Sequence, residues 1–196
     1  MEFDELVRKR RSVRSFKKEK ASWKDVLNAI DAAIQGPFAG NHNNLKFLIV
    51  EDKKKIIDIA DFCEQDWVSE AGILVLVCSD DSHLENTYGD RGRVYSRQEA
   101  GAAIYALMLK LADAGLGTCW VGSYNDGAIR DRLKIPHHVQ IEAVIPVGFE
   151  NDKKDKEAKK KLENVLNWEE WGKSKRPTPF EEELEDYGQK IKKNKK

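Results

Sequence analysis

The sequence predicts one mixed domain in which helices and strands alternate along the chain. Its 196 residues are enough for a single domain with a hydrophobic core and an appended arm. Hydrophobic residues make up 40% of the chain, which favours a packed interior. Their spacing switches between helical periods and short continuous runs, the patterns typical of amphipathic helices and of buried strands.

The first half of the chain is predicted to contain three helices and two strands. Residues 3–9 and 53–63 are expected to be helical, and Ser22 is expected to cap a longer helix that a Gly-Pro pair ends. Residues 47–50 form a short apolar run typical of a strand. The run 73–77 is apolar throughout, so we expect a central strand that is buried on both faces.

The second half is predicted to contain a long loop, two helices and two strands. Residues 80–95 are polar and include glycine, which predicts the loop. Residues 96–114 carry the clearest helical stripe and a cluster of small residues, so this helix is expected to be sandwiched against another backbone. Beyond it we expect a strand at 119–121, a helix capped by Asp126 that ends near 133, and a strand at 141–149 that Pro146 breaks.

The charge balance argues against a dedicated nucleic-acid-binding protein. Lys and Arg total 34, Asp and Glu also total 34, and the sequence pI is about 6.9. Residues 1–20 and 151–196 are net positive, and the region between them is net negative. Such basic ends either form solvated surfaces or converge on one anion in the fold.

The cysteines and apolar runs favour a cytoplasmic protein without a membrane segment. Cys63, Cys78 and Cys119 lack the spacing of a metal site and are expected to be reduced, buried thiols. The N-terminal residues lack the apolar core of a signal peptide. The longest apolar run, 72–78, is far shorter than a bilayer span. No metal-ligand pattern and no nucleophile motif stands out in the sequence.

The first candidate binding motif is a basic run at residues 8–14. It sets the guanidinium groups of Arg10, Arg11 and Arg14 around the hydroxyl of Ser12. Arginine forks hold phosphate oxygens in pairs and serine adds a further donor, so the run suits one phosphate group. A solvated basic face is the alternative that this motif alone leaves open.

Two further motifs are rich in glycine. The loop at 36–44 combines glycine, which permits a close backbone approach, with carboxamides that both donate and accept, so it suits the edge of a uracil-like ring. The segment 115–123 joins a helix to a strand, whereas in the dinucleotide fingerprint a strand precedes the helix. An ordinary turn and a helix cap before a core strand are the respective alternatives.

Taken together and in this order, these segments resemble the nitroreductase family of flavin enzymes from about residue 3 to residue 149. Residues 10–16 match the family's RxSxRxF pattern, 37–41 its PSxxN loop, 115–122 its GLGxxWxG segment, and 145–149 the strand that closes the sheet. The resemblance implies an α+β fold with a mostly antiparallel sheet wrapped by helices. It also implies an intertwined homodimer with two FMN molecules at the subunit interface.

The resemblance assigns residues 1–172 to the FMN-binding domain and leaves 173–196 as a charged C-terminal extension. It implies that the run Arg10, Arg11 and Ser12 binds the phosphate and ribityl end of FMN, with Arg14 beside the pyrimidine side of the ring. The family's basic phosphate anchor beyond the last strand is absent in its usual form. Lys161 is expected to replace it, with the two preceding lysines as alternatives.

The rest of the implied site comes from the glycine-rich motifs. Val121 and Gly122 would bring backbone N–H groups to flavin N5. Each FMN site would also receive residues of the 36–44 loop from the other subunit: Pro37, Phe38, Ala39 and Asn41. The family usually has serine where this chain has Phe38, so the pocket over the flavin is expected to be narrow.

The function implied by the resemblance is that of an FMN-dependent oxidoreductase with NAD(P)H as electron donor. A nitroaromatic or a quinone would be the small-molecule acceptor, and both substrates would use one slot in ping-pong turnover. Relatives dehalogenate, dehydrogenate or cleave flavin, so specialised flavin chemistry is one alternative and a non-catalytic FMN-binding protein is another. Because the flavin carries the chemistry, no catalytic protein acid, base or nucleophile is expected.

Overall fold

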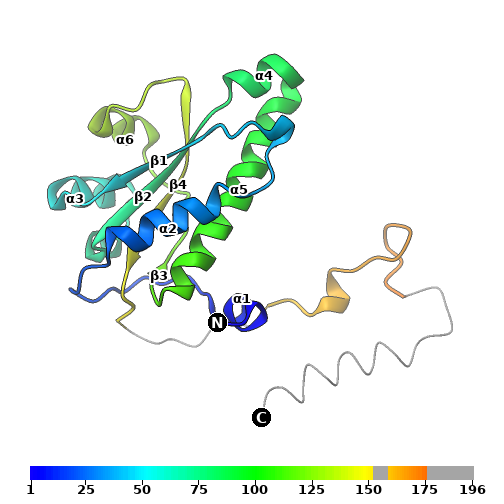
Figure 1. Ribbon diagram of the computed structural model, residues 1–196, viewed down its shortest axis with the longest axis horizontal. Helices are drawn as coiled ribbons and strands as arrows, with labels where there is room; N and C mark the ends of the chain where they lie inside the picture. Colours follow the sequence, from blue (N-terminus) through cyan, green and yellow to red (C-terminus); the bar gives the residue numbers. More distant parts are fainter. Residues whose placement is uncertain (152–158, 176–196) are drawn as a thin grey trace, which may run out of the picture. The chain divides into compact units, whose positions relative to one another are not determined.

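The computed structural model describes residues 1–151 and 159–175 of the chain. The chain divides into two compact units, Met1–Asp155 and Lys156–Lys196, and the fold that follows is that of the first. In the described residues a four-stranded sheet has the order β1-β2-β4-β3, with every pairing antiparallel. Helices cover both of its faces (Figure 1), which confirms the expected α+β fold.

Helices and strands alternate along this unit, as the sequence predicts. The strands are β1 (Leu45–Val50), β2 (Ile73–Asp80), β3 (Gly117–Thr118) and β4 (Val139–Gly148). The α-helices are α1 (Phe3–Lys9), α2 (Trp23–Ala33), α3 (Lys53–Phe62), α4 (Ser82–Tyr88), α5 (Asp90–Asp113) and α6 (Asp126–Leu133). Two short 3-10 helices, η1 (Ala39–Asn41) and η2 (Asp66–Glu70), lie in the connections.

Side-chain caps define where two of the helices begin. Ser22 Oγ accepts a hydrogen bond from the Lys24 N–H at 3.2 Å, which confirms that Ser22 caps α2. For α6 the capping residue is Asn125, whose Oδ1 accepts from the Ala128 N–H at 3.1 Å. The prediction of Asp126 as the cap is therefore wrong by one residue. A capping side chain bonds to an N–H two or three positions on, and only Asn125 has that spacing here.

The predicted loop over residues 80–95 is also wrong, because most of this segment is helical. Helix α4 covers its first part, and α5 begins at Asp90 after Gly89, which has a positive φ of 58°. A Cβ on Gly92 would lie 2.3 Å from the backbone of Leu84, so the two helices touch backbone to backbone. Leu84 is the only apolar side chain buried in the segment. The segment therefore has too few apolar residues to show the helical periodicity of α4 and of the start of α5.

Strand β4 passes through Pro146 and does not break there, contrary to the prediction. Val144 and Val121 exchange two backbone hydrogen bonds of 3.0 Å, so the Val144 N–H points away from β2 and toward the β3 side. N–H groups alternate in direction along a strand, so the N–H that Pro146 lacks would also have pointed to that side. The β3 pairing stops at Val147. Pro146 therefore costs the sheet no bond to β2.

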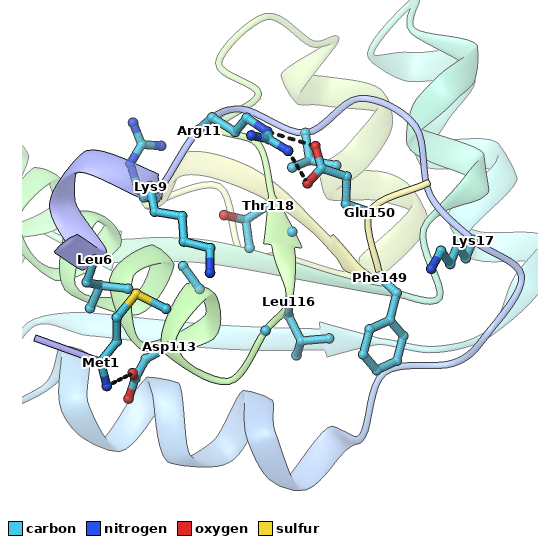
Figure 2. Close-up of a pocket in the computed structure, with 15 residues that line it drawn as sticks. Met1, Leu6, Lys9, Arg11, Lys17, Asp113, Leu116, Thr118, Phe149 and Glu150 are labelled. Atoms are coloured by element: carbon cyan, nitrogen blue, oxygen red, sulfur yellow. Dashed lines mark hydrogen bonds and ion pairs between the residues drawn. The ribbon is translucent and has the colours of Figure 1, made fainter. Parts of the chain in front are cut away.

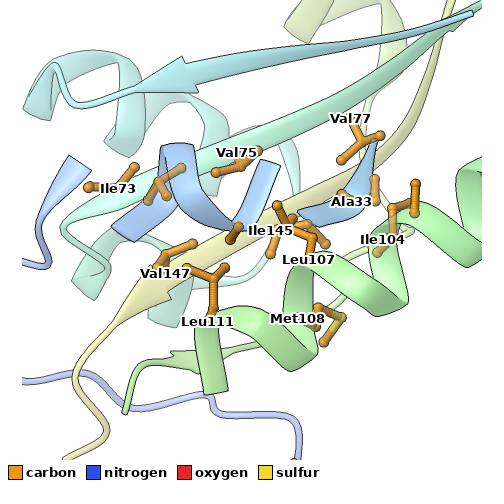
Figure 3. Packing of buried hydrophobic residues seen from close by; sticks show 14 of the residues in the cluster. Ala33, Ile73, Val75, Val77, Ile104, Leu107, Met108, Leu111, Ile145 and Val147 are labelled. Atoms are coloured by element: carbon orange, nitrogen blue, oxygen red, sulfur yellow. The ribbon is translucent and has the colours of Figure 1, made fainter. Parts of the chain in front are cut away.

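The central strand β2 carries hydrophobic core on both of its faces. Ile73, Val75 and Val77 pack together with β4 side chains against α2 and α5, as Figure 3 shows. The intervening Leu74 and Leu76 pack on the other face, against α3, α6 and η2. Because successive side chains of a strand point to opposite faces, this packing confirms that β2 is buried on both sides. The predicted apolar stripe of α5 is buried as well: Ala100, Ala103, Ile104, Leu107 and Leu111.

The three cysteines are free and buried, as the sequence predicts. Burial raises the pKa of the Cys63 and Cys78 thiols to about 11. A thiol with so high a pKa is protonated near neutral pH and is a poor nucleophile. These two cysteines therefore belong to the core and not to a reactive site.

The second unit is described over residues 159–175. It contains the 3-10 helix η3 (Leu162–Asn164), and Trp171 is 95% exposed. Residues 176–196 of the predicted extension 173–196 lie outside the described residues. The domain boundary predicted at residue 172 stays a prediction. Among the described residues, no helix has both the length and the apolar character to cross a membrane.

Candidate functional site

The first and third sequence motifs lie side by side in the structure. The extended chain after α1 runs along β3, where the Val13 N–H donates to the Thr118 carbonyl at 2.9 Å and Ser12 forms a parallel bridge with Thr118. Gly117 makes this approach possible, because a Cβ there would lie 2.9 Å from the Val13 side chain. The basic run and the glycine-rich segment therefore form one surface.

The side chains of the basic run alternate between the interior and that surface. Val13 is buried, whereas Ser12 and Arg14 are exposed. Ser12, Arg14 and Arg10 each lower the pKa of the Cys119 thiol, whereas burial raises it by more. These three side chains therefore lie near the buried sulfur atom of Cys119. The spacing of two residues is that of side chains on one side of an extended chain. Arg10, Ser12 and Arg14 thus form the cationic face of the candidate site.

Cys119 lies under this cationic face and is itself buried. Burial raises the pKa of its thiol, while the charges of Arg14 and Arg10 and a hydrogen bond with Ser12 act in the opposite direction. Desolvation is the largest effect, so the thiol stays protonated at neutral pH. Cys119 is therefore a packing residue of the site and not a nucleophile.

Aromatic rings hold the two guanidinium groups of the cationic face. The Arg10 guanidinium lies 5.8 Å from the centre of the Tyr105 ring, and that of Arg14 lies 6.0 Å from the centre of the Trp67 ring. Within the described parts of the chain, neither guanidinium has a carboxylate partner. A ring orients a guanidinium without neutralising its charge. Both positive charges therefore remain available to an anionic ligand.

Arg11 differs from its neighbours, because its charge is already paired. Its Nε and Nη2 donate to the two carboxylate oxygens of Glu150 at 2.8 and 2.7 Å. Figure 2 shows this pair at the edge of a cavity of about 340 Å³, where Lys9 and Lys17 also lie. Because the charge of Arg11 is already paired with Glu150, we infer that this arginine stabilises the fold, while its predicted contact with the cofactor stays a prediction.

The second motif lies elsewhere on the same chain, against the junction of α4 and α5. The Ala39 N–H donates to Glu99 Oε1 at 2.6 Å, and a Cβ on Gly40 would lie 2.8 Å from the Tyr88 hydroxyl. Phe38 packs partly against the core, while Pro37 is exposed. Asn41 has a positive φ of 58°, like Gly40 before it at 59°. The loop is therefore held in one specific conformation.

Helix α5 separates this loop from the cationic face. The loop bonds to Glu99, whereas Arg10 packs on Tyr105. Six residues of α-helix correspond to about 9 Å along the axis and about a third of a turn around it. Glu99 is buried and Tyr105 is 41% exposed, so the two contacts lie on different faces of the helix. One chain therefore does not bring all of the predicted site residues together.

The predicted backbone donors at the end of the glycine-rich segment are not equivalent. The Val121 N–H donates to the Val144 carbonyl at 3.0 Å, so it is used within the sheet. Gly122 is exposed, and its N–H has no bond to any other described residue. Trp120, 42% exposed, is beside it. The Val121 N–H is therefore occupied and the Gly122 N–H has no partner among the described residues, while the predicted donation to flavin N5 stays a prediction.

Lys161 belongs to the second unit. Its Nζ lies 3.6 Å from Glu163 Oε1, and 79% of its side chain is exposed. Its predicted contact with a phosphate group stays a prediction, as do the alternatives Lys159 and Lys160. Sequence reasoning missed Trp67, Tyr105 and Glu99. Only Glu99 had a signal in the sequence, since it is a carboxylate one turn before Ala103 on the apolar stripe of α5.

Comparison with known proteins identifies the family to which this fold belongs. The nitroreductase family model matches residues 7–83 and 59–149. The chain therefore belongs to the nitroreductase family.

Three relatives illustrate its range. Iodotyrosine deiodinase of Thermotoga neapolitana is 27% identical over an alignment of 168 positions, which covers 78% of this chain and 90% of that protein. FMN reductase [NAD(P)H] of Bacillus subtilis is 25% identical over 176 residues, 81% of this chain and 70% of that protein. The crystal structure of an iodotyrosine deiodinase bound to FMN and 3-iodo-L-tyrosine superposes with a TM-score of 0.72 and 26% identity, covering 81% and 95% of the two chains.

Proposed function

We propose that this protein is an FMN-dependent oxidoreductase that transfers hydride from NAD(P)H to an electron-poor acceptor, a nitroaromatic or a quinone. The observation that carries the proposal is the cationic face, where two guanidinium groups flank the Ser12 hydroxyl and have no carboxylate partner among the described residues. This donor set fits a phosphorylated flavin, which has a phosphate at one end and electronegative ring oxygens at the other. The FMN-bound relative and the FMN reductase relative support the choice of cofactor.

Each residue of the face has a distinct task in this proposal. Arg10 and Ser12 bind the phosphate and ribityl end, since a fork and a hydroxyl match phosphate oxygens. Arg14 lies beside the pyrimidine side of the ring, where its charge favours the reduced, anionic flavin. The free Gly122 N–H donates to N5, the atom at which bound FMN accepts and releases hydride. The protein thereby orients the cofactor and tunes its potential.

We further propose that the site is completed by a second copy of the chain in a homodimer. Pro37, Phe38, Ala39 and Asn41 lie on a different face of α5 from Arg10, so in this arrangement they serve the cofactor of the partner. The surface of α5 between them is open, since a Cβ on Gly101 would have no neighbour within 4 Å among the described residues. Small residues there allow two helices to approach closely.

The proposed turnover is ping-pong, because donor and acceptor stack in turn on one accessible face of the ring. No protein acid, base or nucleophile is assigned in this proposal. The three buried free thiols also suit the proposed cytoplasmic location, where thiols stay reduced.

An absorbance spectrum before and after anaerobic addition of NADH or NADPH tests the proposal. We expect flavin bands in the purified protein, bleached by one of the donors and restored by a nitroaromatic or quinone acceptor. Bands that do not bleach would support the non-catalytic FMN-binding alternative. A protein that takes up no FMN would overturn the proposal.

Reductive dehalogenation is a second candidate, favoured by the similarity to two iodotyrosine deiodinases. In this reaction two electrons and a proton replace the iodine of an iodoaromatic substrate with hydrogen and release iodide. Iodide release from 3-iodo-L-tyrosine by the reduced protein, at a rate above its quinone turnover, would make deiodination the better assignment. Quinone turnover without iodide release would favour the first.

A further inference from the structure

Glu99 is a buried carboxylate with an incomplete set of hydrogen bonds. It lies on the apolar side of α5 with 6% of its surface exposed. Its Oε1 accepts from the Ala39 N–H at 2.6 Å, whereas its Oε2 is buried and has no hydrogen-bond partner in the described structure. A buried polar atom without a partner destabilises the fold. A well-packed apolar residue would avoid this cost, so the carboxylate is better explained by what it holds.

What Glu99 holds is the loop at 37–41, whose backbone is in an unusual conformation. Gly40 and Asn41 both have positive φ values, and a positive φ is unfavourable for a residue with a side chain such as Asn41. A Cβ at position 40 would lie 2.8 Å from the Tyr88 hydroxyl, so the Tyr88 side chain lies against the loop. The hydrogen bond to Glu99 fixes the Ala39 N–H of the same loop. The loop is thus clamped between α4 and α5.

The clamp does not point toward the cationic face of its own chain. Arg10 packs on Tyr105, about a third of a turn around α5 from Glu99. The loop fixed by Glu99 therefore contacts a different face of α5 from the one that the Arg10 of the same chain contacts. In the homodimer of the proposed function, the site that receives this loop is the one built on the Arg10 of the second copy.

We propose that Glu99 is a positioning residue that acts across the dimer, by fixing the loop with which its chain completes the FMN site of the partner. This inference rests on the proposed function. Glu99 touches neither cofactor nor substrate; it acts through the Ala39 N–H. Loss of the clamp releases the loop, and the partner's site then binds FMN less tightly.

Mixed dimers of two differently tagged variants test the direction of this effect. One chain carries Arg10→Ala and the other carries Glu99→Ala, and FMN binding is measured by quenching of flavin fluorescence. If Glu99 acts across the dimer, one site combines both defects. The other site has an intact Arg10 and an intact clamp, and it binds FMN as the wild type does. If Glu99 acts within its own chain, each site has one defect.

We expect each variant homodimer to bind FMN at least tenfold more weakly than the wild type, and the mixed dimer to recover one site of wild-type affinity per dimer. Two weakened sites in the mixed dimer would overturn the inference while leaving the proposed function standing. Unchanged FMN affinity of the Arg10→Ala homodimer, or a monomeric chain, would overturn both.

Two further variants separate positioning from folding. Gln98→Ala changes the exposed neighbour on α5 and is expected to bind FMN normally. Glu99→Gln keeps an acceptor for the Ala39 N–H, so it is expected to recover most of the affinity lost in Glu99→Ala. If Glu99→Ala does not fold, Glu99→Leu takes its place in the mixed dimer, since leucine fills a similar volume and offers no acceptor. A Glu99→Gln homodimer as weak as Glu99→Ala would contradict the role of the hydrogen bond.

Discussion

Gly117 lies so close to Val13 that a Cβ on it would be 2.9 Å from the Val13 side chain. This approach allows the Val13 N–H to reach the Thr118 carbonyl, and it thereby sets Ser12 and Arg14 beside the glycine-rich segment. The site therefore depends on the absence of a side chain at one position of β3.

Gly117→Ala is expected to destabilise the protein by about 1–3 kcal/mol, because overpacking forces the neighbouring backbone apart. The FMN content should fall with it, since the basic run is displaced. Gly127→Ala on α6 is the matched control: its Cβ meets nothing closer than 3.7 Å and favours the helix. Thermal unfolding and flavin content measure the two effects. Equal behaviour of the two variants would show that the close approach is unimportant.

Arg10 and Arg11 are neighbours in sequence with opposite expected phenotypes. Arg10→Ala removes a fork from the proposed phosphate site and should weaken FMN binding about tenfold or more, since a charge-assisted hydrogen bond contributes about 1.5–3 kcal/mol. Arg11→Ala should leave FMN affinity nearly unchanged and instead lower stability, because Glu150 loses its bidentate partner. Flavin titration and urea unfolding of both variants separate the roles. Comparable FMN losses would return Arg11 to the cofactor site.

The sequence was sufficient to predict the parts of this molecule that depend on local pattern. The apolar run of β2, the stripe of α5 and the cap at Ser22 each follow from residues adjacent in the chain. The three motifs were recognisable for the same reason. Helix α4 was missed because Leu84 alone marks its buried side.

Contacts between distant residues were beyond such reasoning. Arg11 and Glu150 are 139 positions apart, and no local pattern indicates that they pair. The same holds for Arg14 and Trp67, which meet only after η2 is placed. In each case the position of an arginine of the basic run depends on a residue that is distant in the sequence, Glu150 for Arg11 and Trp67 for Arg14. The basic run therefore predicted that the site is cationic, but it did not predict which of its arginines is paired within the fold.

The contact between Arg14 and Trp67 predicts how the flavin is tuned. Arg14→Gln should lower the reduction potential of bound FMN, because a positive charge that stabilises the reduced, anionic ring is lost. Trp67→Leu should shift the potential in the same direction by a smaller amount, since the guanidinium keeps its charge but loses its orienting ring. Arg14→Lys should recover part of the shift. Spectroelectrochemical titration measures all three potentials, and an unchanged potential in Arg14→Gln would remove Arg14 from the ring.

Glu99 predicts a pH dependence of stability. Burial raises the pKa of its carboxyl, with the Ala39 N–H and the charge of His42 acting in the opposite direction. The folded state therefore holds the proton more tightly than the unfolded state does. The contribution of Glu99 to stability is greatest below its unfolded pKa of about 4.3 and decreases as the pH rises through the raised value.

The free energy of unfolding of the wild type, relative to that of Glu99→Gln, should accordingly fall as the pH rises from about 4.3. Other ionisable groups near the clamp are shared by both proteins: His83, whose ring centre lies 3.8 Å from that of His42, and Tyr88 beside Gly40. Urea unfolding at fixed chain and FMN concentrations measures the difference, since both ligand and dimerisation shift stability. The corresponding difference for Gln98→Ala, which removes no titrating group, should not change with pH. A flat difference for Glu99→Gln as well would mean that the buried carboxyl titrates alike in the folded and unfolded chain, and that the clamp does not desolvate it.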